Sequence, residues 1–218
     1  ISIMLMSALR VVVGGESLWS KGLHEALIHL SAYADKGNPQ AFEEFQNALS
    51  IPLGVGQARQ ALDAGGHDLA TIQQGLLRGE NHPHDVASVS RVLPYVWQLS
   101  TLAPTIQLWR TGSSYIQKID QLGQSIHTQR NLNRPVSPQI SNQWLQQISQ
   151  LRREVVPLTK EFAASMGRNS RALSNLLLLI NLCTATLLAA LYWVTIQRAM
   201  NESTIASTKL ETERQRST

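Results

Sequence analysis

One long apolar run near the C-terminal end dominates the hydropathy pattern of the chain. Residues 173–196 read LSNLLLLINLCTATLLAALYWVTI and contain no Asp, Glu, Lys, Arg or His. A helix rises about 1.5 Å per residue, so about 20 apolar residues cross the hydrocarbon of a bilayer. Tyr192 and Trp193 lie at the far end of the run, and aromatic rings favour the headgroup layer. The run predicts a transmembrane helix over 171–197. The alternative is a buried core helix, for which the run is unusually long and uniformly apolar.

The chain opens on a shorter apolar segment, ISIMLMSAL, which precedes Arg10. This segment lacks the charged n-region and the cleavage site of a signal peptide. We interpret residues 1–13 as the end of a first transmembrane helix, with an ordinary buried helix start as the alternative. The polar tail over 198–218 is prone to form a helix and contains no terminating Gly or Pro. We interpret it as the start of a cytoplasmic signalling helix or linker, and both ends indicate a fragment of a longer protein.

Between these segments, apolar positions recur with the spacing of amphipathic helices. Trp19, Leu23, Leu27 and Leu30 follow steps of four and three, and no stretch shows the sustained alternation of a strand. Long helices with short connections favour an antiparallel bundle. The sequence therefore predicts an all-α protein in which a helical bundle over 14–170 is inserted between two transmembrane helices.

Glycine and proline predict where the first helices of the bundle begin and end. Gly37 ends the first helix, and Asn38 with Pro39 supplies the N-cap and first position of the second. Because the residue before a proline disfavours helix, Pro52 predicts a break at that point. A short third helix then follows and closes at the Gly65-Gly66 pair, and a fourth ends near residue 79.

The later breaks follow the same rules. Another helix starts at the Asn-His of 81–82 followed by Pro83, and Pro94 should kink it. Pro104 should break or bend the helix again, before a further helix that extends to about residue 130. The Ser137-Pro138 pair predicts the start of the last helix, which we expect to continue into the apolar run. Pro157 predicts a second kink there.

Composition and charge narrow the function classes. The 218 residues carry a net charge of +4, but the basic residues are scattered, so the chain is not expected to bind nucleic acid. The single cysteine, Cys183, lies inside the apolar run and therefore cannot form a disulfide within the bundle or a multi-thiolate zinc site. No nucleophile-elbow, zincin, Walker or dinucleotide-binding motif is present. We therefore predict no catalytic residues, no cofactor and no enzymatic activity for this chain.

Two polar segments contain the highest density of side chains that could bind a ligand or a metal ion. The segment GGESLWSK places Glu16, Trp19 and Lys21 within two helical turns, where they could hold a polar ligand. In the alternative, the glutamate caps the helix, the indole packs in the core and the lysine is solvated. The segment GENHPHD over 79–85 contains imidazoles and a carboxylate, which bind divalent ions. Its spacing matches no established metal motif, so helix capping is favoured and no metal site is predicted.

Four aromatic residues lie on or beside the apolar helix faces: Trp97, Trp109, Tyr115 and Trp144. Aromatic side chains between helices line ligand pockets in many proteins, but packing in the core is the commoner fate and is favoured here.

Four motifs in order resemble a bacterial N-terminal sensor region. They are VVVGGESLWSKG, FQNALSIPLGVGQAR, QGLLRGENHPHDV and IQLWRTG, all before the membrane span. The family precedes diguanylate cyclase or cyclic-di-GMP phosphodiesterase domains, and sometimes histidine kinase domains. Two departures stand out. Gly22-Leu23 replaces the usual Ala-Gln of the first motif, and Gly54-Val55 replaces the usual Gly-Asp of the second, which removes a carboxylate.

The resemblance implies an extracytoplasmic, periplasmic helical sensor in the bacterial inner membrane that controls a cytoplasmic output domain. With it we predict a homodimer that contacts the lipid bilayer and responds to a small-molecule or protein signal of the envelope. The alternatives are the input module of a sensor histidine kinase and a structural or scaffolding membrane anchor. The ligand-binding residues expected for the sensor are Glu16, Trp19, Lys21, Arg59, Asn81 and His82.

Overall fold

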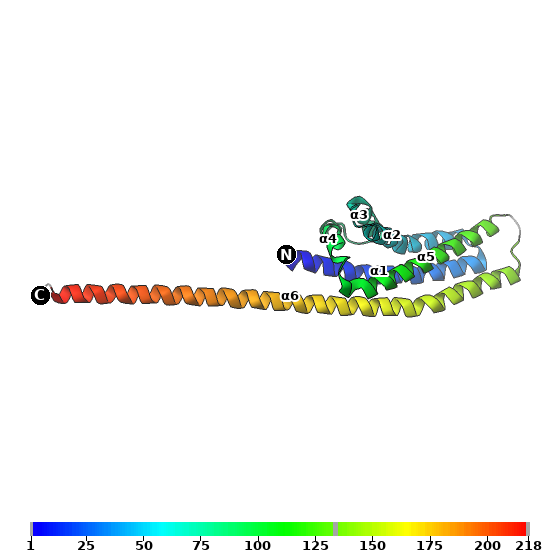
Figure 1. Cartoon of the computed structure of the whole chain (residues 1–218). Coiled ribbons are helices and arrows are strands. Elements are labelled where there is room, and N and C mark those ends of the chain that lie inside the picture. The colour runs from blue at the N-terminus through cyan, green and yellow to red at the C-terminus, as the bar shows by residue number, and fades with distance from the viewer. Residues whose placement is uncertain (1, 133–134, 217–218) are drawn as a thin grey trace. The chain divides into compact units, whose positions relative to one another are not determined.

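The computed structural model describes residues 2–132 and 135–216, with side chains described at 15, 17–132 and 135–200. All regular elements within these ranges are helices, which confirms the all-α prediction (Figure 1). The chain divides into two compact units, one ending at Arg171 and one beginning at Ala172. The first unit holds five α-helices, a short 3-10 helix and the first part of helix α6; the second holds the rest of α6.

Helices α1 (Ser2–Lys36) and α2 (Pro39–Asp63) form a hairpin with a tight turn, as predicted. Gly37 adopts a φ of 68°, in the left-handed region that glycine adopts without a steric penalty. The Asn38 side chain then accepts a hydrogen bond of 3.1 Å from the amide of Gln40 and caps α2. The two helices pack along their length beside α5 (Ala103–Arg130), as Figure 1 shows.

The predicted break at Pro52 is wrong, because α2 runs through it to Asp63. A proline inside a helix leaves the carbonyl four residues earlier, here that of Ala48, without its usual amide donor. This carbonyl faces Gly22 of α1, where an added Cβ would lie 2.9 Å from the oxygen and 3.2 Å from Cδ of Pro52. Close packing of α1 against the proline turn therefore accommodates the irregularity, and the expected third helix is the second half of α2.

Helix α3 (Leu69–Arg78) ends near residue 79 and helix α4 (Pro83–Val96) begins at Pro83, both as predicted. Gly65 and Gly66 make the turn before α3 with φ values of 107° and 70°. Helix α4 ends two residues after Pro94 rather than continuing to Pro104. A 3-10 helix, η1 (Ser100–Leu102), separates it from α5, where Pro104 lies in the first turn.

The buried side chains of the first unit form two clusters. The larger one joins α1, the first half of α2, α5 and α6 (Pro138–Arg216) around residues such as Trp19, Phe45 and Ile119. The smaller one joins the second half of α2 to α3 and α4 around Leu62, Ile72 and others. Side chains that bridge these clusters therefore hold the two parts of the bundle together.

Helix α6 continues without interruption from the bundle through the apolar run, as predicted, and Pro157 lies inside it. Most side chains of the apolar run are exposed, among them Leu178, Leu187 and Trp193, whereas Leu177 is buried. Over the described residues, the segment Pro138–Met200 is long and apolar enough to cross a membrane. The predicted first span over 1–13 is helical from Ser2; its side chains lie outside the described part, so that span stays a prediction.

Candidate functional site

The six predicted ligand residues fall in different environments. Trp19 is buried in the larger cluster with 1% of its surface exposed, and its ring lies 5.3 Å from that of Phe162. Lys21 is exposed and pairs with Glu25 at 3.8 Å, one helical turn away. The side chain of Glu16 lies outside the described residues.

Asn81 and His82 form hydrogen bonds with backbone groups at helix ends. Asn81 is buried, and its Nδ2 donates a hydrogen bond of 2.9 Å to the carbonyl of Leu76 at the end of α3. Exposed His82 accepts a bond of 3.3 Å at Nδ1 from the amide of His84 and caps α4. Within the described side chains, no hydrogen bond or ion pair joins two of the six predicted residues. Their role in binding a ligand stays a prediction.

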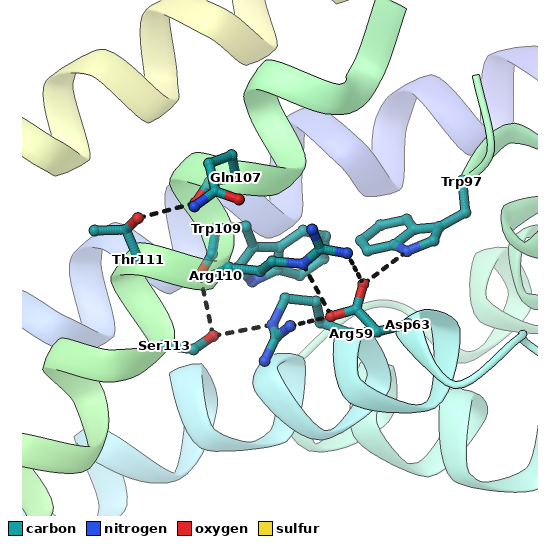
Figure 2. Close-up of polar contacts among 8 residues, drawn as sticks. All are labelled: Arg59, Asp63, Trp97, Gln107, Trp109, Arg110, Thr111 and Ser113. Carbon is teal, nitrogen blue, oxygen red and sulfur yellow. Dashed lines mark hydrogen bonds and ion pairs between the residues drawn. The ribbon is translucent and has the colours of Figure 1, made fainter. Parts of the chain in front are cut away.

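Arg59 instead belongs to a polar cluster that the sequence indicated only in part. The cluster comprises Arg59 and Asp63 of α2, Trp97 just after α4, and Arg110 and Ser113 of α5 (Figure 2). We call these five residues the arginine–aspartate clamp. Its members come from three helical segments that are far apart in the sequence.

Asp63 is the centre of the clamp. Arg110 donates to both carboxylate oxygens, from Nη2 at 2.7 Å and from Nε at 3.3 Å, in a bidentate pair. Trp97 donates its indole N–H to the same carboxylate at 3.1 Å, and Arg59 donates from Nη1. Burial raises the pKa of Asp63, but the bonds from Arg110 and Trp97 and the arginine charges outweigh it, so the pKa is held below 3.8.

Arg59 extends the clamp into the bundle. Its guanidinium is buried, and Nε donates a bond of 3.1 Å to Oγ of Ser113, which in turn donates to the carbonyl of Trp109. Figure 2 shows this chain of bonds beside the separate bond from Thr111 to the Gln107 carbonyl, which stays within α5. Burial lowers the pKa of Arg59, and the charge of Asp63 opposes that change. An arginine nevertheless stays protonated in a protein.

A row of aromatic rings connects the clamp to the core. The rings of Trp97 and Trp109 meet edge to face at 5.5 Å, Trp109 lies 6.0 Å from Phe162, and Phe162 contacts Trp19. Trp97 packs on the smaller cluster and Trp109 on the larger one. The indole nitrogens of Trp19 and Trp109 are buried without a hydrogen-bond partner among the described residues. The row therefore links both clusters to α6 through Phe162.

The clamp is suited to holding helices together and to binding negative charge. Two arginines face one carboxylate, so its formal charge is +1, and planar guanidinium groups pair well with carboxylates and phosphates. Chemistry that needs a metal finds no support in the described part of the chain, where no three His, Cys, Asp or Glu side chains gather.

Of the clamp residues, the sequence predicts Arg59 as a ligand-binding residue. Its ion pair with Asp63 has the four-residue spacing that brings two side chains together on one helix face, so the pair could have been found from the sequence. Arg110 and Trp97 were not assigned to the clamp, because their contacts with Asp63 cross 47 and 34 positions of sequence. The available signal was the IQLWRTG motif, which contains Arg110 and whose Trp109 carbonyl accepts from Ser113.

Comparisons with protein-family models, curated proteins and solved structures found no match to the chain. The resemblance of its motifs to bacterial sensor regions therefore stays a prediction.

Proposed function

We propose that the chain is the sensory input and transmembrane signalling module of a bacterial inner-membrane receptor. In this proposal residues 14–170 sense a signal in the periplasm, 171–197 cross the membrane, and 198–218 lead to a cytoplasmic output domain. That output is most simply the synthesis or degradation of cyclic di-GMP. The observation that carries the proposal is the uninterrupted run of α6 from the bundle core into the apolar segment.

The packing of α6 supports a role in transmission. Trp144, Ile148, Val155 and Phe162 on α6 are buried in the larger cluster, so a change in bundle packing acts on the same helix that continues into the apolar run. A shift, rotation or tilt of that helix, relative to a second copy in a homodimer, would change the arrangement of the cytoplasmic ends. A ligand biases such an equilibrium only by its difference in affinity for the two arrangements.

The clamp and the six predicted ligand residues are the parts of the bundle through which a signal would act. The clamp joins α2, α5 and the end of α4, and its aromatic row reaches Phe162 of α6. Loosening the clamp by mutation is therefore expected to alter the position of α6 without any added ligand.

A chimera tests the proposal. Residues 1–218 are fused to a diguanylate cyclase domain and expressed in bacteria, with zero to four alanines inserted at the junction. Because each inserted residue rotates the helix by about 100°, cyclic di-GMP output should vary with a period of about 3.6 residues if α6 transmits a rotational arrangement. Asp63→Asn, which opens the clamp, should change the output, whereas exposed Asp35→Asn should not.

The rival function is a structural membrane anchor with a helical ectodomain. It predicts equal output for every insertion and for both aspartate variants at matched expression. That result would reject the sensory proposal and leave the anchor.

A further inference from the structure

We infer that the connection between α4 and α5, with the apolar residues that flank it, is a second membrane-contacting surface, which lies in the lipid headgroup layer. The inference rests on the membrane-spanning part of the proposed function. Its first support is composition. Residues 92–109 read VLPYVWQLSTLAPTIQLW, between Arg91 and Arg110, and contain no charged side chain or histidine.

Large apolar side chains in and next to the connection are exposed rather than packed against the bundle. Tyr95 at the end of α4 is 80% exposed and Leu99 is 52% exposed, next to the buried Leu93 and Ile106 on either side of them in the sequence. Amphipathic aromatic rings such as tyrosine are enriched at the boundary between hydrocarbon and water. Exposed apolar groups in an uncharged segment therefore fit a lipid surface as their partner.

Hydrogen bonds fix the level of the connection along α6. Asn169 donates from Nδ2 to Oγ1 of Thr105 at 2.8 Å, and Thr105 also bonds Ser165. Thr105 lies in the first turn of α5, and the apolar run begins four residues after Asn169 in the same helix. At about 1.5 Å per residue, these four residues span about 6 Å along α6. The start of α5 is thus bonded to a residue of α6 that precedes the apolar run by four positions of sequence.

The start of α4 gives an independent marker for the same end of the bundle. Asn81, directly before α4, lies against Gly15 of α1, where an added Cβ would be 3.2 Å from its Oδ1. Residue 15 follows the predicted first span over 1–13. In Figure 1, α4 accordingly lies beside the N-terminal part of α1. The start of α4 therefore lies at the same end of the bundle as residue 15 of α1.

Depth-dependent fluorescence quenching tests the inference. The full chain is reconstituted in phosphatidylethanolamine–phosphatidylglycerol vesicles, and a polarity-sensitive dye is attached to one cysteine at a time. Cys183 itself reports the span, Leu99→Cys in a Cys183→Ser background reports the connection, and Ser125→Cys in the same background is an exposed site near the other end of α5. Circular dichroism checks that each variant keeps its helical content.

We expect headgroup spin labels to quench the dye at position 99 severalfold more than at position 125, while chain-centre labels quench the dye at Cys183. Equal quenching at 99 and 125, with Cys183 quenched, would overturn the inference and leave the transmembrane proposal intact. A blue-shifted but unquenched dye at 99 would also overturn it, since the partner would then be protein, such as a second copy. Absence of quenching at Cys183 would reject the span and the inference with it.

Discussion

At the scale of single residues, Asp63 is the group on which the clamp depends. Its side chain is 22% exposed and balances Arg59 and Arg110, so Asp63→Asn leaves two facing arginines without a counter-charge. We expect the substitution to lower the free energy of unfolding by about 2–3 kcal/mol, since hydrogen bonds to a charged group contribute about that much. Urea unfolding followed by tryptophan fluorescence measures the change, with Asp35→Asn as the exposed control.

The same carboxyl group gives a pH dependence. Because the pKa of Asp63 is lower in the folded state than its ordinary 3.8, the unfolded chain binds its proton first as pH falls. Its contribution is therefore complete above about pH 5 and is lost as pH falls through 3.8 toward the folded-state pKa. In Asp63→Asn the acid limb of the stability curve should be shallower. An acid limb identical to that of the unsubstituted chain would show that the carboxylate is not stabilised by the clamp.

Two buried glycines give opposite expectations for the same change. A Cβ at Gly112 would lie 2.7 Å from Cζ2 of Trp19, whereas a Cβ at Gly56 meets only Oγ of Ser113, at 3.9 Å. Gly112→Ala should therefore destabilise the bundle by about 1–3 kcal/mol through overpacking. Gly56→Ala should stabilise it by about 0.5–1 kcal/mol, since alanine favours a helix interior. Thermal unfolding that ranks the two variants in the reverse order would contradict this account of the α5 contact.

Local residue chemistry was the part of the structure that sequence predicted best. The caps at Asn38 and Ser137 depend on neighbours within three positions, so the local sequence alone identifies them. The contacts of Arg110 with Asp63 depend on how α5 packs on α2 and could not be obtained without the fold.

At the scale of elements, α2 and α3 approach through glycine. A Cβ at Gly75 would lie 2.6 Å from the amide nitrogen of Ala58 and 2.6 Å from the carbonyl oxygen of Gly54, both backbone atoms that cannot rotate away. Gly75→Ala should push α3 away from α2 and cost about 2 kcal/mol. Hydrogen exchange should then be faster in α3 and α4 than in α5, with exposed Gln74→Ala as the matched control. Uniform exchange rates across the bundle would contradict a local separation.

The error at Pro52 shows why element boundaries need the fold. The rule that proline ends helices weighs only the local loss of an amide and the clash of the ring. Here Gly22 lets α1 pack against the affected turn, and burial on both sides of the proline keeps α2 continuous. Pro94 also packs closely on a glycine, Gly66, yet α4 ends two residues after it, so close packing at a proline does not by itself fix where a helix ends.

At the scale of the whole molecule, α6 is one helix with two parts that suit different environments. Its first part contributes Trp144 and Phe162 to a protein core, and its apolar run exposes leucines on every side, which suits lipid rather than water. Periodicity predicted both parts, because the three-four spacing gives way to a run without polar faces.

Side-specific labelling makes the membrane crossing testable. In a Cys183→Ser background, Ser149→Cys on the exposed face of the bundle should react with a membrane-impermeant maleimide from the periplasmic side. Ser207→Cys, in the tail after the span, should react only after the inner membrane is permeabilised.

Arginines in place of Leu182 and Leu187 each cost about 2.5–3.5 kcal/mol at the centre of a span. The double variant should therefore stop the crossing and leave position 207 reactive from the periplasmic side. Arginine at exposed Leu132, outside the run, should leave the labelling pattern unchanged. If positions 149 and 207 react from the same side in the unsubstituted span, α6 does not cross the membrane, and the sensory proposal fails with it.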